Sequence, residues 1–153
     1  MLKEFIDYIN NLKVKSKTIV EFGPGKSTKL FANKFNKIIS YEDNIDYLNT
    51  LDIWNNVEYK LLRRNKFALK DIINDIKKAD YIYIDNNPNY IKRETLLYLS
   101  YKYSRVSCIV ILDNGNWNKK AYNFLKLKYY TRDFIGYRNK KDLVITTVGL
   151  KRI

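Results

Sequence analysis

The chain has 153 residues, one cysteine and no histidine, and its 29 lysines and arginines against 16 aspartates and glutamates give a formal net charge of +13. A chain of this length forms one domain with a core that needs no disulfide or metal to hold it. Because Cys108 lies in an apolar run and histidine is missing, the composition excludes disulfide frameworks, zinc fingers and a histidine base. Any bound metal must be a hard cation with oxygen ligands.

The sequence shows no sign of membrane insertion or export. No apolar run approaches the roughly 18 residues that a membrane span needs. The first residues, Met1 to Glu4, carry no signal-peptide apolar region. We therefore expect a cytoplasmic protein with no membrane partner.

The positive charge leaves a nucleic-acid partner open. Phosphates are bound mainly through lysine and arginine, so an excess of these residues favours such a partner. However, lysine, asparagine, isoleucine and tyrosine are all abundant, as an A/T-rich coding sequence gives without functional pressure, and the lysines are spread along the chain without a dense block. Charge alone does not decide the partner.

Apolar residues recur along the chain with helical and strand spacing in alternation. The spacing predicts a first helix over residues 2–13, packed on the sheet edge, and Leu30 and Phe31 belong to the apolar stripe of the next helix. Further helices are expected over residues 45–54, 67–76, 91–103 and 117–127, and strands over residues 17–22, 37–41, 57–62, 81–84 and 108–112.

The last third of the chain changes character. Residues 129–137 and 143–148 are predicted to be two strands joined by a polar turn, a closing hairpin. Residues 1–153 then form a single domain, composed of an N-terminal helix (1–13), βα units (17–127) and the hairpin (129–150). Strands that alternate with helices imply an α/β fold with a doubly wound, mainly parallel sheet covered by helices on both faces.

Gly23 and Gly25 interrupt the chain between the first strand and the second helix. Two glycines at the end of a buried strand let a ligand approach the backbone closely, and Ser27 or Thr28 can cap the following helix. An ordinary tight turn also explains the pair. A phosphate-binding P-loop is disfavoured because Val20 stands where that motif needs glycine, and a dinucleotide site because Thr28 replaces its third glycine.

Other polar residues follow the later strands, and with the glycine turn they resemble a known family. Glu42 and Asp43 follow the second strand, Asp85 ends the fourth, and Asp113 with Asn114 ends the fifth. Carboxyl ends of parallel strands share one edge, so these residues should converge. The order of motifs resembles the class I S-adenosylmethionine-dependent methyltransferases over nearly the whole chain. That resemblance implies a seven-stranded sheet with the last strand antiparallel.

The resemblance also assigns a cofactor site. It implies that S-adenosyl-L-methionine lies across the first two strand ends, with its methionine part at Glu21, Gly23, Gly25 and Ser27, and Thr28 is also expected to contact the cofactor. Glu42 would hold the ribose hydroxyls, because a carboxylate accepts two hydrogen bonds from a diol. Asp43 could serve instead. Asp85 is included among the residues expected to contact the cofactor.

Two resemblances imply different methyl acceptors, and the sequence does not decide between them. Asp85, Asp113 and Asn114 resemble the metal site of catechol and caffeoyl-coenzyme-A O-methyltransferases, which implies Mg²⁺ and a hydroxyl activated by it. Residues 85–90 instead resemble a degraded Asn-Pro-Pro-Tyr motif of amino-methyltransferases acting on nucleic-acid bases, with stacking on Tyr90 or Trp117. Asp85, Tyr90 and Asp113 are thus the candidate catalytic residues.

The length of the chain also bears on what covers the site and on the kind of substrate. Small-molecule enzymes of this fold usually add a lid, and this chain has no spare length for one. A large substrate such as RNA or DNA, a second subunit in a homodimer, or the N-terminal helix could cover the site. A domain that binds the cofactor or a partner without catalysis also remains open.

Overall fold

The computed structural model describes residues 1–63, 66–86, 90–138 and 141–152, and these form alternating helices and strands. The strands are β1 Thr18–Phe22, β2 Lys37–Glu42, β3 Val57–Leu61, β4 Tyr81–Ile84, β5 Ile109–Leu112, β6 Tyr129–Arg138 and β7 Asp142–Lys151. The helices are α1 Lys3–Asn11, α2 Lys26–Ala32, α3 Ile45–Leu48, α4 Lys66–Lys78, α5 Arg93–Tyr103 and α6 Lys119–Lys128, with a 3-10 turn, η1, at Gly115–Trp117. Within the described ranges, no helix combines the length and apolar character that crossing a membrane requires.

The strands form one seven-stranded sheet in the order β3-β2-β1-β4-β5-β7-β6. The first five strands pair in parallel, while β7 lies antiparallel between β5 and β6. The chain winds outward in both directions from β1 and β4, so the switch point lies between these two strands. The topology confirms the predicted doubly wound, mainly parallel sheet with its last strand antiparallel.

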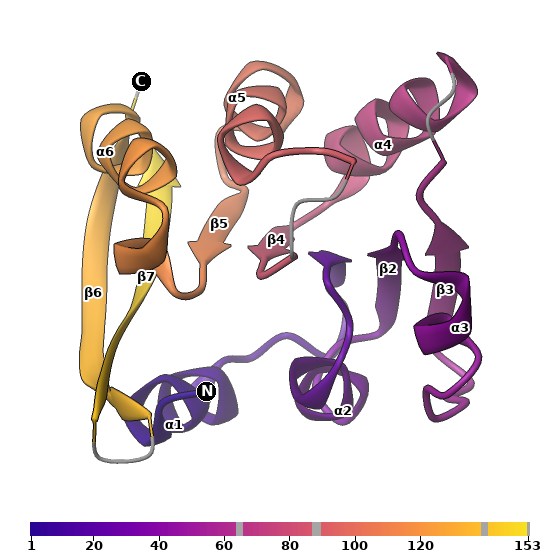
Figure 1. Ribbon diagram of the computed structural model, residues 1–153, viewed down its shortest axis with the longest axis horizontal. Coiled ribbons are helices and arrows are strands. Elements are labelled where there is room, and N and C mark those ends of the chain that lie inside the picture. The colour runs from indigo at the N-terminus through magenta and orange to yellow at the C-terminus, as the bar shows by residue number, and fades with distance from the viewer. Residues whose placement is uncertain (64–65, 87–89, 139–140, 153) are drawn as a thin grey trace.

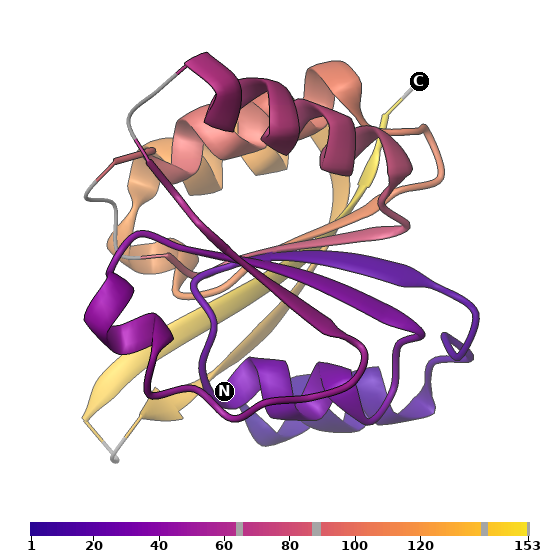
Figure 2. The ribbon, with the colours of Figure 1, turned by 90° about the vertical axis from the view of Figure 1, so that its right-hand side faces the viewer.

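Helices cover both faces of the sheet. Figure 1 and Figure 2 show α4, α5 and α6 on one face, and α1 and α2 on the other. The β1 side chains alternate between the two layers, since Val20 packs into the core under α4 and α5, whereas Ile19 packs into the core with α1 and α2. Because both faces are covered at the centre of the sheet, the central strands β4 and β5 consist of apolar and aromatic residues throughout.

Two helices differ from the expectations. α1 lies on a face of the sheet and not on its edge, because its buried Phe5 and Ile9 pack against Tyr83 and Phe134. The predicted helix over residues 45–54 ends at Leu48. The Thr50 hydroxyl donates to the Tyr47 carbonyl at 2.7 Å and so takes the acceptor that the next helical turn would use.

Candidate functional site at the carboxyl ends of the strands

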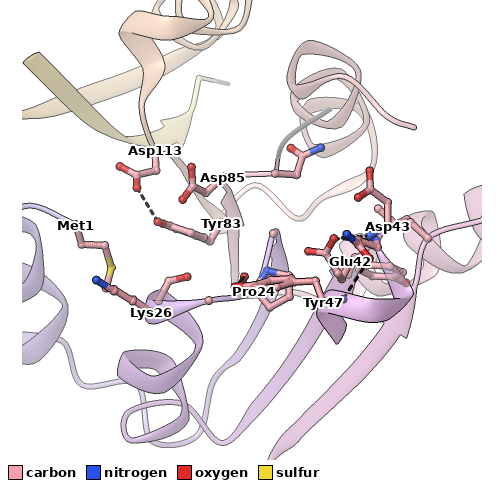
Figure 3. A pocket seen from close by; sticks show the side chains of 16 residues that line it. Met1, Pro24, Lys26, Glu42, Asp43, Tyr47, Tyr83, Asp85 and Asp113 are labelled. Atoms are coloured by element: carbon pink, nitrogen blue, oxygen red, sulfur yellow. Dashed lines mark hydrogen bonds between the residues drawn. The ribbon is translucent and has the colours of Figure 1, made fainter. Parts of the chain in front are cut away.

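A cavity of about 470 Å³ opens at the carboxyl ends of β1, β2 and β4, beside the switch point. Figure 3 shows Tyr83, Asp85 and Asp113 on one side of it, Glu42, Asp43 and Tyr47 on the other, and Pro24 between them. The lining is completed by Met1, Gly23, Gly25, Lys26, Ser27, Tyr41, Asn44, Leu62 and Asn86. The strand ends therefore converge as predicted.

The turn after β1 needs glycine for a physical reason. Gly23 has a φ of +89°, and a Cβ there would lie 2.8 Å from the backbone N and Cα of Asn86. Both the conformation and the crowding exclude a side chain. A Cβ on Gly25 would meet the Tyr47 hydroxyl at 3.3 Å. The turn therefore presents bare backbone to the cavity.

Glu21 lies beneath this turn and is fully buried. Its carboxylate accepts hydrogen bonds from the hydroxyls of Ser27 at 2.5 Å, Thr28 at 2.8 Å and Ser40 at 2.8 Å. Burial raises the pKa of Glu21 from its ordinary value of 4.5 to about 7, although the three hydroxyls favour the ionised form. Glu21 thus ties the turn to β2 from below and does not line the cavity.

The other residue below the turn is Thr28. Its Oγ1 accepts a hydrogen bond from the Gly25 backbone N–H at 2.9 Å, so Thr28, and not Ser27, satisfies the helix start. Thr28 is buried and does not line the main cavity, whereas Ser27 does. Of the predicted cofactor residues, the glycines, Ser27, Glu42, Asp43 and Asp85 line the cavity.

Glu42 ends β2 and forms one wall. Its Oε1 accepts hydrogen bonds from the backbone N–H groups of Asp43 at 3.0 Å and Asn44 at 2.9 Å, which fix the position of the carboxylate. Burial raises the pKa of the Glu42 carboxyl. Tyr47, which the sequence did not single out, donates to the Pro24 carbonyl at 3.2 Å and joins α3 to the glycine turn.

Asp113 and Tyr83 form the opposite wall. The buried Tyr83 hydroxyl donates to Asp113 Oδ2 at 2.9 Å, and the Thr146 hydroxyl donates to Asp113 Oδ1. Burial and the nearby carboxylates raise the pKa of Tyr83 well above its ordinary value, so Tyr83 remains a neutral donor. Both oxygens of Asp113 therefore accept bonds from side chains of the chain itself.

Arg93 is the main residue that the sequence analysis missed. It is 9% exposed, and its guanidinium donates to Asp85 Oδ1 at 3.2 Å, to the Asn86 carbonyl at 2.9 Å and to the Asp113 carbonyl. A single side chain thereby holds the carboxyl ends of β4 and β5. Arg93 is the first residue of α5, and a helix that follows a parallel strand begins near the carboxyl edge of the sheet, where the cavity lies. This position could have indicated Arg93 from the sequence.

The described side chains do not fit the predicted Mg²⁺ site. Asp85 already faces the Arg93 guanidinium, and the side-chain amide of Asn114 donates to Asp85 Oδ1 at 2.8 Å. Asp113 is engaged with hydroxyls, as described above. Over the part of the chain that the structure describes, no group of three or more His, Cys, Asp or Glu side chains could hold a metal ion.

The candidate stacking residues lie outside the cavity wall. Tyr90 is 45% exposed and Trp117 is 56% exposed, and neither lines the cavity. Residues 87–89, the centre of the resemblance to the amino-methyltransferase motif, fall outside the described residues. That motif, and a catalytic role for Tyr90, remain predictions.

No protein-family model and no curated protein matches the chain. Among solved structures, the precorrin-6y C5,15-methyltransferase from Geobacter metallireducens has a TM-score of 0.73 and 14% identity, covering 97% of this chain and 87% of its own. An rRNA methylase from Streptococcus thermophilus has a TM-score of 0.72 and 10% identity, covering 99% of each chain. The chain has the class I methyltransferase fold. An O-methyltransferase from Bacillus cereus, solved in complex with SAH, has a TM-score of 0.71 and 15% identity and covers 97% of this chain and 82% of its own.

Proposed function

We propose that the chain is an S-adenosylmethionine-dependent methyltransferase that acts on an oxygen or nitrogen acceptor. One observation carries this proposal: the cavity at the switch point has bare backbone at Gly23 and Gly25 on one side and the fixed carboxylate of Glu42 on the other. This is the position at which doubly wound sheets bind ligands.

The cavity suits a nucleoside-sized cofactor with an amino-acid tail. Its volume of about 470 Å³ lies in the range of small-molecule sites. Glu42 can accept two hydrogen bonds from ribose hydroxyls, and the turn at Gly23 allows the tail to approach the backbone. Ser27, in the first turn of α2, lies beside the tail in this arrangement. Asp43 extends the acidic wall.

The opposite wall suits the methyl acceptor. S-adenosylmethionine, when bound, supplies an electrophilic methyl group on a positively charged sulfur. Asp85 and Asp113 line the cavity, where an acceptor O–H or N–H can donate a hydrogen bond to the Asp85 carboxylate. Tyr83 orients Asp113, and Arg93 orients Asp85. These contacts give the wall a fixed geometry before any ligand binds.

The test is calorimetry of the purified chain with four ligands. S-adenosylmethionine and S-adenosylhomocysteine should bind with one site each, whereas ATP and NAD should show no saturable binding at the same concentrations. Binding of ATP or NAD in their place would show that the turn at Gly23 and Gly25 binds phosphate groups. Absence of binding by either sulfur ligand would contradict the proposed function.

A further inference from the structure

Lysines that are spread through the sequence come together at the end of the sheet opposite the cavity. The last turns of α4, α5 and α6 carry Lys77, Lys102 and Lys128. Figure 2 shows α3, beside the cavity, at one end of the sheet and the C-terminal end of β7 at the other. Lys151 and Arg152 stand at that second end.

The Tyr101 ring gathers cations from two other elements. The ammonium group of Lys151, at the end of β7, lies 5.0 Å from the centre of the ring, and that of Lys128, at the end of α6, lies 5.6 Å from it. Both distances are within the reach of a cation–π interaction. The Tyr101 ring also packs edge-on against Phe124 and Tyr129, so the platform under these lysines is fixed.

The Tyr103 ring, two residues further along α5, also has two lysine ammonium groups near it. Lys77 from α4 and Lys102 from α5 place their ammonium groups 5.9 Å and 5.2 Å from its centre. At the other side, the Arg152 guanidinium lies 5.0 Å from the Tyr130 ring. We call this the amino-end basic surface: Lys77, Lys102, Lys128, Lys151 and Arg152 on the rings of Tyr101, Tyr103 and Tyr130.

These cations lack carboxylate partners within the described residues, where the ion pairs use other side chains. The nearby Asp80 binds Lys17 and Arg105, and Asp133 binds Lys126. Like charges held together without anions repel one another and create a strong positive potential. An anionic partner would relieve this repulsion.

Helix dipoles explain only part of the cluster. Lysines in the last turn of a helix offset its negative end, which accounts for those on α4, α5 and α6. Lys151 ends a strand, where no such dipole acts, whereas the Arg152 guanidinium donates to the carbonyls of Tyr129 at 3.0 Å and Lys126 at 3.4 Å, so the end of α6 accounts for Arg152 as well. The position of Lys151 over the Tyr101 ring, beside Lys128, therefore needs a separate cause.

We propose that the amino-end basic surface binds the phosphate backbone of a nucleic acid. Its cations lie over the Tyr101 and Tyr103 rings, so the surface presents fixed charges in place of the free aromatic faces that would insert into a membrane. The 65% exposed Tyr130 beside Arg152 offers a face on which a base can stack. The proposal does not rest on the methyltransferase activity.

The experiment measures fluorescence anisotropy of a labelled 20-nucleotide single-stranded RNA, and DNA of the same sequence, across a potassium chloride series. The test variant carries Lys102→Ala, Lys128→Ala and Lys151→Ala. We expect at least a tenfold loss of affinity at low salt, and a salt slope reduced by about 2, since each lost phosphate contact on a single strand removes about 0.7. The matched variant Lys3→Ala, Lys70→Ala and Lys120→Ala removes the same charge elsewhere and should lose less than threefold.

Three results would overturn this proposal. Equal losses in both triple variants would mean that net charge alone binds the polymer, and unchanged affinity in the test variant would place the contact elsewhere. Anionic phosphatidylserine vesicles whose binding depends on the test lysines, while RNA and DNA binding does not, would assign the surface to a membrane.

Lys→Arg at the three test positions keeps the charge and should keep the binding. Calorimetry with S-adenosylmethionine on the same variants separates this result from the proposed function, because cofactor binding should be unchanged.

Discussion

The Arg93 guanidinium lies 3.2 Å from the Asp85 carboxylate at the edge of the cavity. Its other nitrogens donate to the backbone carbonyls of Asn86 and Asp113, just after β4 and β5. The buried Arg93 guanidinium therefore occupies the place where the sequence suggested a bound Mg²⁺ ion. This contact makes Asp85 part of a fixed wall. It also explains why two neighbouring carboxylates, Asp85 and Asp113, tolerate each other at one edge of the sheet.

Replacing Arg93 should destabilise the fold strongly. Arg93→Met leaves Asp85 without its cation and removes the donors to two buried carbonyls, so we expect a loss of about 3 kcal/mol or more in the free energy of unfolding. Urea denaturation measures it. Arg105→Met is the control, because Arg105 is half exposed and pairs with Asp80 at the surface, where such pairs contribute at most about 1 kcal/mol. Similar losses in the two variants would contradict the role given to Arg93.

Divalent cations should not bind the cavity of the wild-type chain. The Arg93 guanidinium repels a second cation beside Asp85, and the oxygens of Asp113 accept hydroxyl groups. Thermal unfolding with Mg²⁺ or Mn²⁺ should therefore give the same midpoint as with a chelator. A saturable rise of the midpoint with either metal, lost in Asp85→Asn, would restore the metal site.

Glu42→Ala should weaken the binding of S-adenosylhomocysteine at least tenfold, on the order of 1.4 kcal/mol. The substitution removes the carboxylate that accepts the ribose hydroxyls, while the rest of the cavity keeps its shape. The matched variant Asp43→Ala removes the adjacent charge and should change the dissociation constant by less than about threefold. Calorimetry measures both, and the reverse order of effects would transfer the role to Asp43.

Glu21 should make the stability of the fold depend on pH. Its pKa is about 7 in the folded chain against an ordinary 4.5, so the folded state binds the proton more tightly than the unfolded state. The resulting stabilisation, about 3 kcal/mol, is fully present below the unfolded pKa and is lost as pH rises through about 7. Urea denaturation at pH 5 and pH 8 should show this fall in the wild type.

Two variants isolate the contribution of Glu21 to that fall. Glu21→Gln should flatten the dependence between pH 5 and pH 8, because glutamine does not titrate. Glu4→Gln, at an exposed position on α1, should keep the wild-type slope. A slope unchanged in Glu21→Gln would show that other groups cause it.

The mainly parallel sheet and the position of the cavity could be predicted because strands alternate with helices and several apolar runs end in a polar residue or a glycine turn. Gly23, Glu42, Asp85 and Asp113 all follow such runs, and parallel strands bring their ends together. The face on which α1 packs could not be predicted, since the amphipathic pattern gives a buried side but no partner.

Contacts between side chains that are distant in the sequence could not be predicted either, because the sequence pattern does not name their partners. Tyr83 and Asp113 are 30 residues apart and meet only because β4 and β5 are neighbours. Arg93 carries no periodic signal that distinguishes it from a surface arginine. The lysines that form the amino-end basic surface are scattered along the chain, and only the fold brings them onto Tyr101 and Tyr103.

A structure of the chain crystallised with S-adenosylhomocysteine would show directly whether the cavity is the cofactor site. We expect the ligand in the cavity beside the switch point, with its ribose hydroxyls within hydrogen-bonding distance of Glu42 and its amino-acid tail against the turn at Gly23 and Gly25. A ligand bound elsewhere on the chain, or one whose ribose lies away from Glu42, would contradict it.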